Sequence, residues 1–243
     1  MRNFSHRVSY NNSFVCWYCT CIEKQVDLVF ALGGADQITL GTFQKQKDFI
    51  KQFLDTYGTS TRGVHVGIID YGLGAVIAKF ENFDTDNLKD KVDKLRLTRG
   101  GAVVSALRSS QSQLFGDPKL LRPQAIKGLI VLTGERINEG DTALRDAASP
   151  LTSKGIKIVA LAVGDTPDKR KLLIFASGDE YVFDFNSVRD LPSLVPKVYE
   201  VIVKGNLTLL FCWFDDLETC CRKGYMCTVF QIRWFKWKLC QRF

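Results

Sequence analysis

The stretch VDLVFALGGADQ, residues 26–37, decides the fold of this chain. Its first seven residues are apolar except for Asp27, which is typical of a strand buried on both faces of a parallel sheet. Small and polar residues follow directly and lead into a long amphipathic segment over residues 39–57. A buried strand, a small-residue loop and a helix in that order predict one unit of an α/β sheet.

The same alternation continues along the chain. Short apolar runs alternate with segments long enough for a crossover helix, which predicts an α/β fold: a doubly wound, mostly parallel six-stranded sheet with one antiparallel edge strand and helices on both faces. A length of 243 residues with 46% hydrophobic content fits one globular domain with flanks. We expect strands near 26–32, 64–71, 75–80, 127–133, 157–163 and 180–185, and helices near 39–57, 85–95, 102–114, 141–154, 168–176 and 189–203.

Local signals support these boundaries. The sequence Gly-Leu-Gly at 72–74 separates the second and third strands and predicts a hairpin, which makes the third strand the antiparallel one. Thr39 or Thr42 is suited to cap the first helix, and Asp84 the second. Pro150 lies inside the fourth helical stretch, where it kinks or ends the helix.

Three segments together resemble a known family. They are VDLVFALGGADQ at 26–37, VHVGIIDY at 64–71 and GLIVLTG at 128–134. These segments are similar to strands of von Willebrand factor type A domains, above all those of collagen VI and the matrilins, and the resemblance covers residues 26–203. It implies a Rossmann-like A domain. It also implies a non-catalytic extracellular module that binds proteins of the matrix, collagen among the candidates.

The resemblance further implies a metal-ion-dependent adhesion site, and its ligands are missing here. In the family the first loop reads Asp-x-Ser-x-Ser, a second loop supplies a Thr, and an Asp closes a Leu-Thr-Asp-Gly turn. Gly33, Ala35 and Gln37 stand in the first loop of this chain, Gly134 stands at the last Asp, and the GGAVV loop at 100–104 has no Thr. Mg²⁺ requires near-octahedral oxygen ligation. Water can replace one lost ligand but not five, so we expect a degenerate site with no metal and no cofactor.

The remaining polar residues of these loops are the candidates for binding a partner. In open α/β sheets, ligands meet the loops at the carboxyl ends of the strands. We expect contact through ordinary hydrogen bonds and ion pairs, without a bridging cation; the alternative for each residue is that it is only a solvated loop group. The candidates are Asp36, Gln37, Arg99, Glu135 and Arg136, and Asp70 and Asp165 lie in the same loops.

Two other functions are weaker alternatives. A nucleotide-binding enzyme is disfavoured because residues 33–37 lack the Gly-x-Gly-x-x-Gly pattern and no Gly-Lys-Ser/Thr occurs in the chain. His65 is the only histidine of residues 26–203 and fits a strand position better than a base or a ligand. A purely architectural domain, packed against sibling domains of a larger matrix protein, stays open, and an unusually large exposed apolar patch would favour it.

The charge lies mostly outside the patterned region. The chain carries a net charge of +7 with a pI near 9.0. Residues 1–25 carry +2 and residues 204–243 carry +4, which leaves +1 for residues 26–203. A nearly neutral domain gives no electrostatic argument for binding nucleic acid. We therefore divide the chain into a Cys- and aromatic-rich tail at 1–25, the A-type domain at 26–203, and a basic Cys- and aromatic-rich tail at 204–243.

The two tails contain all eight cysteines, which allow 105 disulfide pairings. The first tail loosely fits a signal peptide but lacks an Ala-x-Ala cleavage site, so an extracellular localisation follows from the resemblance alone. The apolar run at 207–214 is too short to span a bilayer. Residues 231–239 mix cations with aromatics and would suit an anionic membrane surface as an amphipathic helix. The alternative is that both tails extend beyond the true exons of the gene.

Overall fold

The computed structural model describes residues 25–33, 38–98, 100–134, 136–164, 168–185, 191–204, 211–212, 225–232 and 235–242. By its internal contacts the chain forms two compact units. One is Glu23–Asn206, and the other combines Met1–Ile22 with Leu207–Phe243. Each unit is described by itself.

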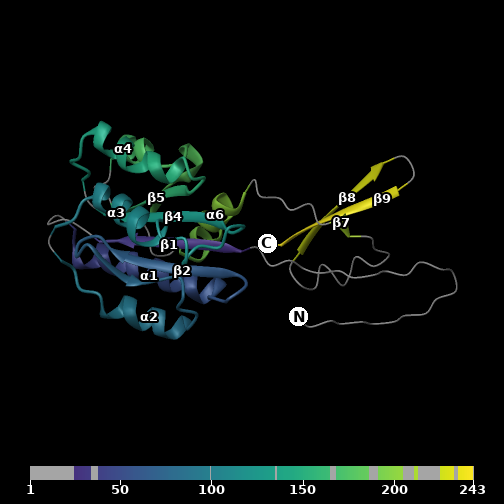
Figure 1. Cartoon of the computed structure of the whole chain (residues 1–243), viewed down its shortest axis with the longest axis horizontal. Helices are drawn as coiled ribbons and strands as arrows, with labels where there is room; N and C mark the ends of the chain where they lie inside the picture. The colour runs from purple at the N-terminus through teal and green to yellow at the C-terminus, as the bar shows by residue number, and fades with distance from the viewer. Residues whose placement is uncertain are drawn as a thin grey trace. The chain divides into compact units, whose positions relative to one another are not determined.

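A six-stranded sheet forms the centre of the larger unit (Figure 1). The spatial order is β3-β2-β1-β4-β5-β6, and every neighbouring pair is parallel except β2 and β3. This confirms the predicted fold class, including the antiparallel edge strand. The strands are β1 (Val26–Leu32), β2 (Val64–Asp70), β3 (Ala75–Ala78), β4 (Ile126–Thr133), β5 (Lys157–Val163) and β6 (Val182–Phe185).

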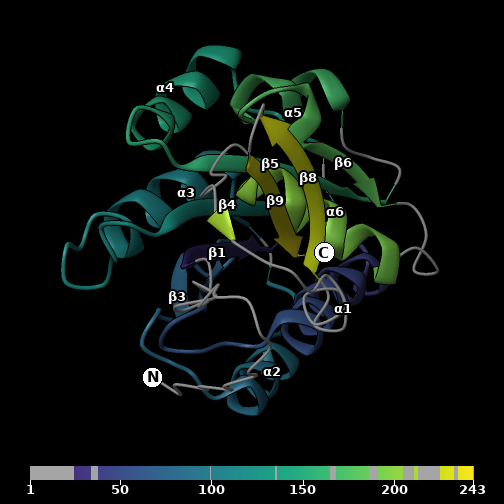
Figure 2. The same ribbon diagram turned by 90° about the vertical axis from the view of Figure 1, so that its right-hand side faces the viewer.

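Helices cover both faces of this sheet, as Figure 2 shows. Helices α1, α2 and α6 pack on one face, and α3, α4 and α5 pack on the other. They are α1 (Leu40–Tyr57), α2 (Thr85–Lys94), α3 (Val103–Ser109), α4 (Asp141–Thr152), α5 (Lys169–Phe175) and α6 (Leu191–Val203). A π-helical turn, η1 (Ser110–Leu114), continues α3, and a 3-10 turn, η2 (Asp179–Tyr181), precedes β6.

The two hydrophobic cores meet at β1, whose residues are all fully buried. Successive side chains of a strand point to opposite faces. Phe30 accordingly packs on the α1 side, where its ring contacts those of Phe49 and Phe53 at centroid distances of 6.4 and 5.0 Å. Val29 lies in the cluster on the α3 side. The apolar run at 26–32 therefore contributes side chains to both hydrophobic cores.

The helix ends follow the predicted capping chemistry. The Thr39 hydroxyl accepts a hydrogen bond from the Thr42 N–H at 3.0 Å, so Thr39 rather than Thr42 caps α1. Asp84 caps α2 by accepting from two backbone N–H groups. Pro150 lies in the last turn of α4. The predicted helix at 102–114 is α3 followed by η1, where the Ser110 hydroxyl donates to the Ala106 carbonyl at 2.7 Å and competes with regular helical bonding.

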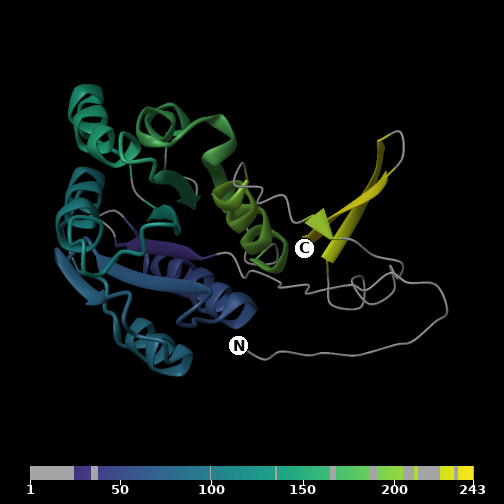
Figure 3. The same ribbon diagram turned by 45° about the vertical axis from the view of Figure 1, so that its right-hand side comes forward.

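The smaller unit contains a three-stranded antiparallel sheet in the order β7-β9-β8, yellow in Figure 3. Its strands are β7 (Phe211–Cys212), β8 (Tyr225–Ile232) and β9 (Phe235–Arg242). Residues 231–239 are therefore strand where they are described, not the amphipathic helix on which the membrane-surface hypothesis depended. Within the described ranges no helix combines the length and apolarity needed to cross a bilayer.

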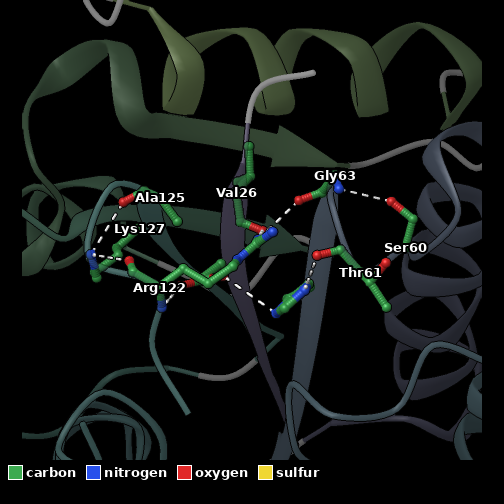
Figure 4. A network of polar contacts seen from close by, with 9 residues as sticks. Val26, Ser60, Thr61, Gly63, Arg122, Ala125 and Lys127 are labelled. Atoms are coloured by element: carbon green, nitrogen blue, oxygen red, sulfur yellow. Dashed lines mark hydrogen bonds and ion pairs between the residues drawn. The ribbon is translucent and has the colours of Figure 1, made fainter. Parts of the chain in front are cut away.

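A buried ion pair joins the starts of β1 and β2 to the segment before β4 (Figure 4). Asp27 is fully buried, and the Arg122 side chain that pairs with it is mostly buried. The Arg122 Nε donates to Asp27 Oδ1 at 2.9 Å, and the Arg122 backbone N–H donates to Oδ2 at 3.1 Å. The Nη2 group donates to the carbonyls of Val26 and Gly63, each at 2.9 Å. Arg122 therefore binds both oxygens of a buried carboxylate, and its guanidinium also binds the backbone carbonyls of Val26 and Gly63.

His65 borders the same network in a structural position. Its Nε2 lies 3.3 Å from the Thr61 carbonyl oxygen, and its Nδ1 lies 3.7 Å from Asp27 Oδ1. Its ring lies 4.8 Å from that of Phe83. Burial, and next the Arg122 charge, lower the pKa of His65. The imidazole is therefore held neutral at physiological pH beside an ion pair that already satisfies Asp27.

We expect Arg122→Met to lower the free energy of unfolding by about 3–5 kcal/mol, because it leaves the buried Asp27 charge without its cationic partner. Urea denaturation of the full chain measures this loss. Arg108→Met is the matched control, since Arg108 is exposed on α3, and it should change the stability by less than about 0.5 kcal/mol. Equal effects of the two substitutions would contradict a structural role for the ion pair.

Candidate functional site

The candidate site is the edge of the sheet where the parallel strands β1, β4 and β5 end. The loops that follow these strands begin at Gly33, Gly134 and Gly164. The segment before α3 and the β2–β3 turn lie at the same edge, because Gly101 and Gly33 both approach Gly72. Open α/β sheets bind their ligands at this edge.

Gly33, which the family resemblance assigns to the first ligand position, is held by a side chain of α1. It follows β1 directly with φ of +150°, a conformation that favours glycine. Its N–H donates to Gln46 Oε1 at 3.0 Å, and its carbonyl accepts from Gln46 Nε2 at 3.1 Å. Gln46 is fully buried. The oxygen and the nitrogen of its amide therefore both form hydrogen bonds with the backbone of Gly33.

Gly134, which the family resemblance assigns to the last ligand position, lies at the end of β4 and is closely covered. A Cβ atom added there would lie 2.3 Å from Thr42 Cγ2 and 2.9 Å from the Val163 carbonyl oxygen. The preceding Thr133 is fully buried, and its hydroxyl has no hydrogen-bond partner among the described residues. The space of an acidic side chain is therefore taken by α1 and by the β5 backbone.

The loop before α3 is tied to the β4–α4 loop by a carboxylate. Ala102 is the N-cap of α3 and offers no side-chain oxygen to it. The Val104 N–H instead donates to Glu139 Oε1 at 3.3 Å. Lys171 of α5 donates to the Glu139 carbonyl at 2.9 Å and to Asp141 at 2.6 Å. Direct bonds between protein groups thus connect this edge from α3 to α5.

Asp70 ends β2 with a carboxylate that is only half satisfied. Its Oδ1 accepts from the N–H groups of Gly72 and Leu73 at 2.9 and 3.1 Å, which shapes the β2–β3 turn. Its Oδ2 is buried and has no hydrogen-bond partner among the described residues. Burial raises the pKa of Asp70 despite these two hydrogen bonds. The residue is only 1% exposed, so it shapes the turn rather than presenting a charge to a partner.

The structure describes some of the residues predicted for this site. Gly33 and Gly134 lie buried at the ends of β1 and β4, at the same edge. Arg136 is exposed in the loop after β4. The other predicted positions lie outside the described residues; they are Ala35, Asp36, Gln37, Arg99, Glu135 and Asp165.

Sequence reasoning missed Gln46, Thr42 and Glu139. The signal for Gln46 is a polar residue on the apolar stripe of a helix, between Phe43 and Ile50. Such a residue is buried and must find hydrogen-bond partners. Its partner Gly33 was not predictable from that signal, because the pairing depends on how α1 packs over β1.

The described groups at this edge do not fit a divalent cation. Gly33 and Gly134 have no side-chain oxygen, and the structure leaves no room for a carboxylate at Gly134 without displacing Thr42 or the Val163 carbonyl. The backbone carbonyl of Gly33 is already bound by Gln46. Among the residues with described positions, no three His, Cys, Asp or Glu side chains come together as a metal cluster.

The fold defines a class: a doubly wound α/β domain with one antiparallel edge strand and helices on both faces. A model of the von Willebrand factor type A domain matches residues 27–197, most of the chain. The chain belongs to the von Willebrand factor type A domain family.

Known proteins place the chain within this family. It is 25% identical to chicken matrilin-3 over 223 residues, which is 87% of this chain and 48% of matrilin-3. It is 22% identical to the mouse collagen alpha-4(VI) chain over 195 residues, which is 76% of this chain and 8% of the collagen. The chain thus spans about half or less of the length of these relatives.

Solved structures share the fold. Proximal thread matrix protein 1 from the mussel byssus, described with a zinc-occupied adhesion motif, superposes with a TM-score of 0.63 at 22% identity. That match covers 77% of this chain and 47% of the mussel protein. At this identity the likeness shows the fold alone.

We expect Gly33→Asp to destabilise the domain by about 1–3 kcal/mol, since a side chain at this φ is strained and its Cβ would lie 2.9 Å from the Gly72 nitrogen. Gly140→Asp is the matched control. Gly140 is the N-cap of α4 with φ of −65° and has open space around it, so an aspartate there is neutral or stabilising. Thermal unfolding with and without Mg²⁺ measures both. A Gly33→Asp variant that Mg²⁺ stabilises would contradict our account of the edge.

We expect Asp70→Asn to stabilise the domain by about 1 kcal/mol at pH 7, because it removes an unpartnered buried charge and keeps the acceptor for the turn. A carboxyl whose pKa is raised in the folded state costs stability above that pKa, so the gain should fade as the pH falls through it. Denaturation from pH 7 down to pH 3 measures this. Asp168→Asn, which changes an exposed cap of α5, is the control and should give no gain at pH 7.

Proposed function

We propose that residues 26–203 form a non-catalytic module that binds a protein of the extracellular matrix, collagen among the candidates, without a bridging metal ion. Similarity to matrilin and collagen VI domains supports the class of partner. Binding without a metal ion is supported by the contacts at the carboxyl edge of the sheet. Side chains of the protein, Gln46, Thr42 and Glu139, occupy or connect the loops at which the family carries its metal ligands.

We propose that the partner contacts the polar loop residues Asp36, Gln37, Arg99, Glu135 and Arg136. Arg136 is exposed just beyond the end of β4, as such a contact requires. Binding would then rest on hydrogen bonds and ion pairs at a wet, polar surface, which supports moderate affinity that weakens with salt.

An architectural role is less well supported by the described surface. Three large apolar side chains are notably exposed among the described residues: Leu40, Leu73 and Phe83. Leu73 follows the last residue of β2, whereas Phe83 packs on His65 near its first. Leu73 and Phe83 lie at opposite ends of β2, so these two side chains do not belong to one continuous patch of the kind that packing against sibling domains requires.

Binding of the full chain to immobilised collagens and matrix extracts tests the proposal, in parallel with millimolar Mg²⁺ and with EDTA. We expect equal binding in both buffers. Arg136→Glu should weaken it about tenfold by reversing a charge at the contact, whereas Arg108→Glu on α3 should leave it unchanged. Binding abolished by EDTA would overturn the metal-free mode, and no binding to any matrix protein would overturn the partner class.

A further inference from the structure

A glutamine, Gln46, is completely buried on the apolar face of α1. It lies in a stripe that also contains Phe43, Phe49, Ile50 and Phe53. Burying an amide is unfavourable unless its polar groups form hydrogen bonds. A Leu or Met side chain would fill the same space without burying a polar group. The buried amide is therefore expected to form specific hydrogen bonds.

The Gln46 amide forms two hydrogen bonds with the backbone of Gly33. The Gly33 N–H donates to Oε1 and the Gly33 carbonyl accepts from Nε2. Neighbouring strands do not supply these bonds, since the β1–β2 pairing ends at Leu32 and the β1–β4 pairing ends at Ala31. Gln46 thus offers Gly33 a donor and an acceptor together, as a paired strand residue would. It extends the ordered backbone of β1 by one residue beyond the sheet.

We propose that Gln46 is the positioning residue of the adhesion edge: its amide fixes Gly33, and with it the start of the first loop, in a metal-free conformation. Asp36 and Gln37 follow Gly33 by three and four residues in the sequence. The relevance to binding rests on the proposed function, but the fixing of Gly33 does not, because it is measured without a partner.

Gln46→Met tests the proposal with little change in volume. Hydrogen exchange followed by NMR on the full chain should show protection of the Gly33 amide reduced about tenfold or more, because both hydrogen bonds are lost. Protection of Val29, inside β1, serves as the internal reference for global stability and should fall less. Gln44→Met is the matched control, since Gln44 is exposed on the same helix and bonds only to Asp48 among the described contacts; it should change neither amide.

Gln46→Glu adds a readout that simple core packing would not give. As a carboxylate, the new side chain cannot donate to the Gly33 carbonyl, so protection of Gly33 should be low at neutral pH. As a neutral acid it regains both a donor and an acceptor. Exchange rates corrected for the intrinsic effect of pH should therefore show protection returning as the pH falls, with a midpoint above 4.3 because the group is buried.

The outcomes separate the two proposals. Unchanged Gly33 protection in Gln46→Met, or protection in Gln46→Glu that does not depend on pH, overturns the role of Gln46. If Gly33 loses protection as expected but the wild-type chain binds no matrix protein, the positioning role stands and the proposed function fails. If the chain binds matrix protein while Gly33 keeps its protection in Gln46→Met, the proposed function stands and the positioning role fails.

Discussion

The burial of β1 on both faces is the constraint on which the rest of the structure depends. A central parallel strand exposes no side chain to water, so each residue must find its place in one of two cores. Phe30 anchors the core under α1, and Val29 belongs to the core under α3. Helices on both faces, and the strands on either side, follow from the need to cover this one strand.

The two ends of β1 pose the opposite problem, because polar groups are buried there. At the start, Arg122 from the segment before β4 donates hydrogen bonds to Asp27 and to the backbone carbonyls of Val26 and Gly63. At the end, Gln46 reaches from α1 to satisfy both backbone groups of Gly33. In each case one side chain with several hydrogen-bonding groups binds backbone groups at or beside that end of the strand. The end closed by Gln46 is the edge where the family binds its ligands.

Much of the fold and part of the site were predictable. The six strands were predictable because their apolar runs have the length and spacing of a parallel sheet, and the 72–74 turn marked the antiparallel one. The interruption of α3 was not, since the Ser110 bond that accompanies the π-helical turn is a local competition that periodicity does not reveal. The absence of metal ligands at Gly33 and Gly134 stays a prediction that rests on the family resemblance and on glycine having no side-chain oxygen.

The sequence by itself determined the class of fold, since this depends on residue type and on order along the chain. Only the tertiary structure decided which side chains surround the two glycines at the ends of β1 and β4. Gln46 meets Gly33, and Thr42 covers Gly134, because α1 packs across the carboxyl ends of β1, β4 and β5. Such pairings join residues far apart in the chain through the geometry of packing, which no local pattern of polar and apolar residues encodes.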